Sequence, residues 1–119
     1  MSNYVFRIVY ERDWVRALRE GYVPQSPLDV QDGFVHLSSF DTVIDTANLY
    51  FDPSQNPLVL KMSVSSLGEE LRWEWVESRR AMFPHLYGVI SAQVVHSTIA
   101  LIHRASGFEL GPEQKRTAL

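Results

Sequence analysis

Hydrophobic positions change from one periodicity to another near residue 10. Residues 4–10 (YVFRIVY) are rich in β-branched and aromatic residues, and this short run predicts a strand in which Arg7 is the only charged member. Apolar residues then recur at helical spacing over residues 11–21 (ERDWVRALREG). This pattern predicts a short amphipathic helix in which Gly21 forms a left-handed C-terminal cap.

A polar segment and a second strand–helix pair follow. Residues 22–33 contain two prolines and an Asp-Gly pair, which predicts a surface loop that could act as a lid. Residues 34–38 (FVHLS) predict a strand, and the apolar stripe of residues 38–51 predicts a helix. Ser38 and Asp41 match a capping box at its start.

The second half of the chain is dominated by strand patterns. We expect strands at 57–64, 71–77, 89–95 and 98–105, a turn at 65–70 and an irregular segment at 78–88. Two early helices followed mostly by strands with short connections predict an α+β fold with a largely antiparallel sheet. One domain is expected over residues 1–110, and the polar residues 111–119 are expected to form a C-terminal tail that frays.

Composition narrows the classes of function. A chain of 119 residues can bury a single core without covalent staples, and the absence of cysteine excludes disulfides, thiol nucleophiles and thiolate metal sites. The formal net charge of -3 argues against a DNA-binding or other nucleic-acid surface. No apolar run approaches the roughly 20 residues that a membrane span needs. We therefore expect a soluble cytoplasmic protein.

The first candidate site residues lie at the end of the FVHLS strand. An extended backbone places His36 and Ser38 on one side, next to the predicted start of the following helix. A helix N-terminus attracts anions, and a neutral imidazole can bond a sugar hydroxyl. The alternative is that Ser38 only caps the helix and His36 bonds a neighbouring carbonyl group.

Glu74 is the candidate carboxylate. It lies between Trp73 and Trp75 in the strand pattern LRWEWVE. Partial desolvation near aromatic rings raises the pKa of a carboxyl group unless a cation or hydrogen-bond donors hold it charged, and either state is useful in catalysis. The alternative is an exposed strand face on which Glu74 pairs with Arg72 or another arginine.

A second histidine lies among apolar residues in the segment MFPHLYG. His85 and Tyr87 align on one side if this segment is extended, and two histidines in similar surroundings favour a shared polar pocket. The four histidines show no metal-ligand spacing, so no metal site is expected. Phosphate-loop, dinucleotide-binding and serine-nucleophile motifs are also missing from the sequence.

Four segments taken together carry a family resemblance. The succession GFVHLSS, ANLYF, LRWE and FPHLYG resembles the small bacterial proteins of the domain of unknown function 952 family, from about Tyr4 to about Ile102. This resemblance implies a fold similar to the ADP-ribosyltransferase class, in which NAD lies in a notch between two small sheets. It also implies roles in order along the chain: Arg7 on the first strand, His36 with Ser38 on the second, and Glu74 on a later strand.

The leading interpretation is an NAD-type nucleotide-binding enzyme that acts at the ribosyl carbon, by ADP-ribosyl transfer or glycohydrolysis. The assigned roles are phosphate binding for Arg7, sugar orientation for His36 and Ser38, charge stabilisation for Glu74, and pocket lining for His85 and Tyr87. One alternative is a non-catalytic module that binds a nucleotide or another small anion. Another is a structural domain whose histidines satisfy core carbonyl groups. RNA 2′-phosphate transfer to NAD is disfavoured because the chain has a net negative charge.

Overall fold

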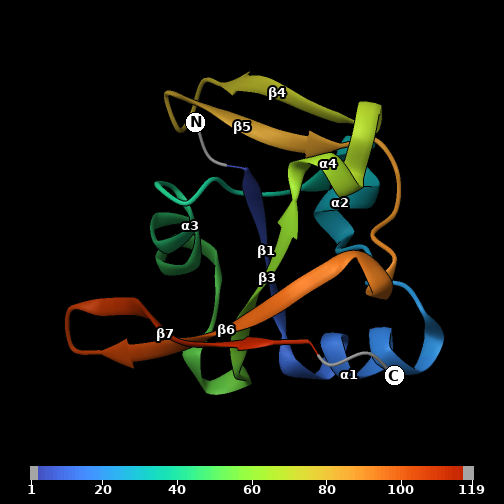
Figure 1. Ribbon diagram of the computed structural model, residues 1–119. Coiled ribbons are helices and arrows are strands. Elements are labelled where there is room, and N and C mark those ends of the chain that lie inside the picture. Colours follow the sequence, from blue (N-terminus) through green and yellow to red (C-terminus); the bar gives the residue numbers. More distant parts are fainter. Residues whose placement is uncertain (1–2, 117–119) are drawn as a thin grey trace.

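Two antiparallel sheets form the centre of the structure, a computed structural model that describes residues 3–116 (Figure 1). The four-stranded sheet has the order β1-β3-β6-β7, and the three-stranded sheet has the order β2-β5-β4. The strands are β1 (Tyr4–Tyr10), β2 (Val35–His36), β3 (Pro57–Ser63), β4 (Leu71–Val76), β5 (Ala81–Leu86), β6 (Val95–Arg104) and β7 (Gly107–Lys115). The helices are α1 (Glu11–Glu20), α2 (Pro27–Asp32), α3 (Val43–Tyr50) and α4 (Val64–Leu67), with 3-10 turns at Pro53–Gln55, Gly68–Glu70 and Ala92–Val94.

The predicted mixture of helices and antiparallel strands is confirmed. Every strand pair in both sheets is antiparallel. In Figure 1 the β4–β5 hairpin lies at the top, the β6–β7 pair lies at the bottom, and β1 and β3 run between them. The first strand and the first helix have the predicted bounds, and Gly21 caps α1 with a φ of 95°.

Strand β1 is buried on both faces because its two sets of alternating residues enter different apolar clusters. Val5 and Val9 pack with α1 and the three-stranded sheet, whereas Phe6 and Ile8 pack with α3 and the four-stranded sheet. Arg7 shares the face of Val5 and Val9, as the alternation predicts, and is only 7% exposed. A buried guanidinium on this face requires a partner, and the next elements provide it.

The two sheets are connected through Ser38. The Ser38 amide donates to the Phe6 carbonyl at 2.7 Å, and the Phe6 amide donates to the Ser38 carbonyl at 2.9 Å. This single bridge joins the segment after β2 to the free edge of β1. Beyond the bridge the edge of β1 is open, and the candidate site lies there.

The expectation of a loop over residues 22–33 is wrong, because this segment contains helix α2. Ser26 caps α2 by accepting from the Asp29 amide, and the Asp29 carboxylate accepts from the Ser26 amide, so a complete capping box starts the helix. Pro27 occupies the first turn, where a missing N–H costs nothing. Gly33 ends the helix in the left-handed conformation with a φ of 82°.

The predicted capping box of Ser38 and Asp41 does not form. Helix α3 begins at Val43, after Thr42, and the Thr42 side chain makes no capping hydrogen bond to the first turn, because it contacts Ser39 instead. The reason is that the backbone of Ser38 stays extended to pair with β1, which leaves residues 39–42 as a turn. The strand expected at 34–38 is correspondingly short, since β2 comprises Val35 and His36.

Two further expectations in the second half are wrong. Residues 78–88 include β5, the central strand of its sheet, despite Pro84. The Pro84 carbonyl accepts from the Leu37 amide, so the missing N–H faces Leu37, one residue past the end of β2, and the ladder with β4 on the other side is not interrupted. Residues 89–94 form an irregular segment, an isolated bridge at Ser91 and a 3-10 turn rather than a strand, although Ile90 is buried, and Val95 begins β6.

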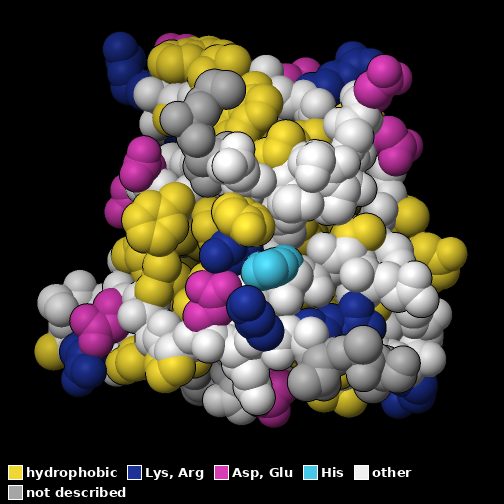
Figure 2. Space-filling view, viewed as in Figure 1, with side chains coloured by type: hydrophobic (Ala, Val, Ile, Leu, Met, Phe, Trp, Pro, Cys, Tyr) yellow, Lys and Arg dark blue, Asp and Glu magenta, His cyan; other side chains and the backbone are white. Residues whose placement is uncertain are grey.

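The hairpin of β4 and β5 has an apolar outer face and a mixed inner face, on which Arg72, Glu74 and His85 lie beside Val76 and Phe83. Trp73, Trp75 and Met82 are exposed by 42%, 55% and 49%, and hydrophobic side chains gather over this hairpin in Figure 2. Glu74 lies on the opposite face, as the alternation predicts. Its diagonal neighbour across the ladder is His85, which pairs with Arg72.

The C-terminal residues continue the four-stranded sheet. Strand β7 extends to Lys115 and pairs with β6, so the expectation of a fraying tail is wrong for residues 111–115. Residues 117–119 of the expected tail lie outside the described residues. Within residues 3–116 no helix is long and apolar enough to cross a membrane.

Candidate functional site

A pocket of about 800 Å³ lies along the open edge of β1, between the two sheets. Arg7, His36, Ser38 and His85 line it, so four of the six predicted site residues meet in one cavity. Glu74 and Tyr87 are not part of the lining. The remaining walls come from α1, α2 and the segment before it, the C-terminal half of α3 and the β4–β5 hairpin.

The pocket is richer in cations than the chain as a whole. Its charged lining consists of four arginines and two aspartates, namely Arg7, Arg12, Arg16, Arg79, Asp13 and Asp32. This local excess occurs in a protein whose formal net charge is -3. A concave surface with this balance favours an anionic ligand.

Arg7 is held by a buried carboxylate from α2. Its Nη2 lies 2.5 Å from Asp29 Oδ2, and its Nη1 donates to the His36 carbonyl at 2.8 Å. The Asp29 side chain is completely buried. Burial alone would raise the pKa of Asp29, but the hydrogen bond from His36 and the charge of Arg7 outweigh it and hold the pKa well below its usual range.

His36 bridges two carboxylates on α2. Its Nδ1 lies 2.6 Å from Asp29 Oδ1, and its Nε2 lies 2.9 Å from Asp32 Oδ2. Desolvation lowers the pKa of His36, but the hydrogen bonds to Asp29 and Asp32 outweigh it, so the pKa is raised. Because both ring nitrogens face carboxylates, the arrangement favours an imidazolium that donates from both. The anion site expected between His36 and a helix N-terminus is replaced by this bridge.

A second polar group involves Glu74, His85 and Tyr87. Glu74 Oε1 accepts from Tyr87 Oη at 2.7 Å and lies 2.8 Å from His85 Nδ1. The hydrogen bonds from Tyr87 and then His85 lower the pKa of Glu74, and the same carboxylate raises the pKa of Tyr87. Glu74 is therefore held ionised, which is the second of the two states that the sequence allows for a carboxylate near aromatic rings.

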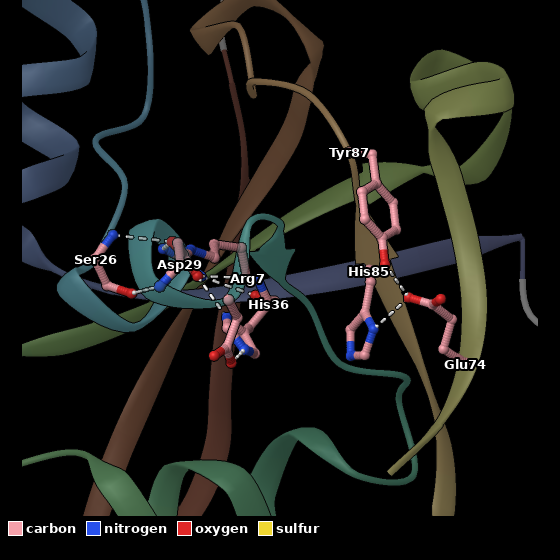
Figure 3. A network of polar contacts seen from close by, with 8 residues as sticks. Arg7, Ser26, Asp29, His36, Glu74, His85 and Tyr87 are labelled. Atoms are coloured by element: carbon pink, nitrogen blue, oxygen red, sulfur yellow. Dashed lines mark hydrogen bonds and ion pairs between the residues drawn. The ribbon is translucent and has the colours of Figure 1, made fainter.

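The Phe34 ring joins the two polar groups. It stacks on His85 with a centroid distance of 4.0 Å and lies 4.6 Å from the ring of His36. His36 and His85 are directly opposite each other in the β2–β5 ladder, with ring centroids 5.8 Å apart. Figure 3 shows His85 between Glu74 on one side and the group of Arg7, Asp29 and His36 on the other. Both predicted histidines therefore belong to one site.

A comparison with models of protein families identifies the family of the chain. Residues 8–98 match the family model described as "Protein of unknown function (DUF952)". The chain belongs to the DUF952 family. The DUF952 resemblance inferred from the four sequence segments is confirmed.

Solved structures of one bacterial protein are similar to this DUF952 domain. The X-ray crystal structure of protein CC0527 from Caulobacter crescentus has a TM-score of 0.80 and 31% identity, covering 88% of this chain and 91% of that chain. Its solution NMR structure has a TM-score of 0.77 and 31% identity, covering 90% and 91%. A search of curated proteins finds no match. These comparisons support the mixed α+β fold and assign no activity to the chain.

Sequence reasoning missed two charged residues of the DUF952 site. Asp29 was overlooked because the segment 22–33 was read as a loop, although the Ser-Pro-x-Asp spacing is itself a helix-start signal. Arg79 lines the pocket and donates to Thr46 Oγ1 at 3.0 Å. Ser38 Oγ donates to the same oxygen at 3.4 Å. Nothing in the local sequence around Arg79 indicates this contact, since Thr46 is 33 positions away.

The described part of the chain contains no candidate metal-binding cluster. Residues 3–116 contain no group of three or more histidine, aspartate or glutamate side chains that could hold a metal ion. The polar side chains that line the DUF952 pocket carry imidazole, carboxylate, hydroxyl, amide and guanidinium groups.

Proposed function

We propose that this DUF952 domain binds an NAD-type nucleotide in the pocket between its sheets and acts at the ribosyl carbon. Three features support the proposal: a volume in the range of small-molecule sites, an excess of arginine, and aromatic walls that include Tyr10, Tyr50 and Phe83. A nucleotide combines anionic phosphates with a flat base, so it matches both the cations and the rings. A likeness to the ADP-ribosyltransferase class is part of this proposal, and the position of the pocket between two sheets supports it.

The observation that carries the proposal is the setting of His85. This side chain is 7% exposed, lines the pocket, and has its Nδ1 fixed by an ionised carboxylate. No described residue bonds its Nε2. When Nδ1 donates to Glu74, Nε2 carries the lone pair, and the carboxylate stabilises the imidazolium formed when Nε2 takes a proton.

This geometry suits hydrolysis at the ribosyl carbon. The bond between that carbon and the nicotinamide nitrogen breaks, and its electron pair leaves with nicotinamide. A water oxygen bonds to the electron-poor carbon while its proton passes to His85 Nε2, and the imidazolium then releases that proton to solvent. The predicted direct role of Glu74 at the sugar becomes a positioning role, because the carboxylate acts on the pocket through His85.

A non-catalytic binding module is the second candidate, and a specific observation favours it. Arg7 and His36, two of the residues expected to bind ligand, already use their charges on Asp29 and Asp32. Their role in the proposal is to shape the pocket wall, and a pocket of this kind can hold a ligand without turning it over.

The test is thermal unfolding of the protein against NAD, ADP-ribose, AMP and nicotinamide, combined with an assay for released nicotinamide. A ligand at a hundred times its dissociation constant adds about 2.7 kcal/mol of stability, which moves the midpoint by several degrees in a domain of this size. A saturable shift with NAD together with nicotinamide release supports the enzyme. A shift without product supports the binding module, and no shift with any nucleotide refutes the proposal.

A further inference from the structure

Arg79 occupies a fixed place at the β4–β5 turn. Residues 77–80 form this turn, in which the Arg79 amide donates to the Val76 carbonyl at 3.1 Å and the Arg80 amide donates to the Glu77 carbonyl at 3.2 Å. Arg80 ends it in the left-handed conformation with a φ of 51°. The turn directs the half-buried side chain of Arg79 into the pocket lining, whereas Arg80 is exposed and does not line the pocket.

The guanidinium of Arg79 is held by contacts that leave its charge uncompensated. It donates one hydrogen bond to Thr46, and its central carbon lies 4.7 Å from the centroid of the Phe83 ring and 6.0 Å from that of Tyr50. A neutral hydroxyl and aromatic faces orient the plane of the guanidinium without neutralising its positive charge. At least one edge of the guanidinium, with its N–H donors, stays available, since only Nη2 has a hydrogen-bond partner among the described residues.

The other pocket arginines differ from Arg79. Arg7 is paired with Asp29 at 2.5 Å, and Arg16 is paired with Glu20 at 2.6 Å. Arg12 is exposed and donates to Gln55. Among the described residues, Arg79 is the pocket arginine that combines partial burial, an oriented plane and no carboxylate partner.

We infer that Arg79 anchors a phosphate group of the ligand. The planar fork of a guanidinium matches two phosphate oxygens, and the surrounding rings reduce the competition from water. Thr46 links this anchor to Ser38, so the predicted site residue and Arg79 lie on one hydrogen-bonded network. The inference rests on the proposed function, because it assumes that the pocket receives a nucleotide, and it assigns the phosphate to a residue outside the four sequence segments that carry the family resemblance.

Isothermal titration calorimetry with paired ligands tests the assignment. Wild-type protein, Arg79→Gln and Arg80→Gln are titrated with AMP, adenosine and inorganic pyrophosphate. Arg80→Gln is the matched control, because it makes the same change of charge in the same turn but outside the pocket. Arg79→Gln should weaken AMP and pyrophosphate binding about tenfold or more while leaving adenosine binding unchanged. Arg80→Gln should leave all three unchanged.

The outcomes separate this inference from the proposed function. AMP binding that Arg79→Gln does not weaken overturns the inference and leaves the nucleotide proposal standing. Wild-type protein that binds pyrophosphate through Arg79 but binds neither AMP nor NAD supports the anion anchor and overturns the nucleotide proposal. Wild-type protein that binds none of these probes overturns both. If Arg79→Gln fails to fold, Arg79→Lys replaces it, and it should show weakened AMP binding because a lysine lacks the fork.

Discussion

At the scale of single residues, the site divides its chemistry between a group inside the pocket and a group behind it. His85 lines the cavity, and its Nε2 has no hydrogen-bond partner among residues 3–116, whereas Glu74 holds the Nδ1 nitrogen from outside the lining. Tyr87 donates to the same Glu74 oxygen and helps to keep that carboxylate ionised. The arrangement fixes one tautomer of His85, which a solvent-exposed histidine would not have.

Substitutions at His85 and Glu74 should distinguish the acid–base group, His85, from its positioning residue, Glu74. If the domain releases nicotinamide from NAD, His85→Gln should lower kcat by about 10²–10⁴-fold, the usual contribution of a positioned acid–base group. Glu74→Gln should lower kcat less and should change the pH profile of kcat, because the tautomer and the imidazolium lose their support. Steady-state kinetics across pH is the measurement. A Glu74→Gln protein with wild-type kcat and pH profile would remove the pair from the mechanism.

At the scale of secondary-structure elements, one carboxylate attaches helix α2 to both sheets. Asp29 accepts from the Ser26 amide within α2, from both Nη atoms of Arg7 on β1, and from the His36 amide and ring on β2. The short helix therefore owes its position to buried polar contacts rather than to an apolar face. Because Ser26, Leu28 and Asp32 line the pocket, the same contacts determine the shape of one pocket wall.

Asp29→Asn should destabilise the fold strongly. The substitution leaves Arg7 buried opposite a neutral amide, and breaking a buried pair in this way costs about 3–5 kcal/mol. The matched control is Asp32→Asn, which changes the same kind of charge on the same helix at a carboxylate that is 35% exposed, and we expect a loss below about 1 kcal/mol. Urea unfolding of both variants at neutral pH measures the difference. Equal losses would show that burial of Asp29 does not matter.

The bridge at His36 predicts how stability depends on pH. Desolvation opposes the charge on His36, but the bonds to Asp29 and Asp32 prevail and raise its pKa, so its contribution is fully present below the unfolded pKa of about 6.5. It is lost as pH rises through the folded pKa. The pKa of Asp29 is lowered, so its contribution is present above about pH 4 and is lost in acid.

Urea unfolding of wild type and His36→Gln between pH 6 and pH 9 measures this dependence. The free energy of unfolding of the wild type should fall relative to that of the variant as pH rises. Arg7, which donates to the His36 carbonyl, and His85, whose ring lies near that of His36, both remain in the variant, so their effects cancel in the difference. A difference that stays constant across this range would contradict the charged bridge.

Local signals determined which elements the sequence could predict. Strand β1 and helix α1 have strong periodicity and a glycine cap, and their bounds follow from the sequence. Helix α2 is not predicted because the two prolines of residues 22–33 suggest a loop, and the buried face of the helix is a single aspartate rather than an apolar stripe. Strand β5 was missed because Pro84 argues against a central strand, and only the short length of β2 makes it acceptable.

At the scale of the whole molecule, the site is produced by contacts between distant segments. His36 and His85 meet because β2 pairs with β5, and Arg79 reaches the pocket because the β4–β5 turn lies beside α3. Sequence reasoning could propose the two histidines from their unusual surroundings, but the partners of each residue depend on strand order. The same limit applies to Glu74: the sequence predicts it at the ligand, and the structure places it outside the pocket lining and bonded to the lining residue His85.

The C-terminal strand provides a test at this scale. Residues 111–115 were expected to fray, yet they extend β7 along β6, with Ser97 opposite Lys115 and Ile99 opposite Glu113. Glu113 also accepts from Ser97 Oγ at 2.6 Å and pairs with Lys61 on β3 at 3.2 Å, so the segment is connected to two strands of the sheet.

Ending the chain after Leu110 should therefore lower the midpoint of thermal unfolding by at least about 4 °C, the shift that corresponds to roughly 1 kcal/mol in a domain of this size. The cause would be the loss of ladder hydrogen bonds and the exposure of the edge of β6, which a fraying tail would not protect. Glu113→Gln in the full chain is the matched variant: it keeps the strand but removes one charge, and it should cost less than the truncation. An unchanged midpoint after truncation would show that residues 111–115 contribute no pairing energy, and the domain would then end where the sequence pattern suggested.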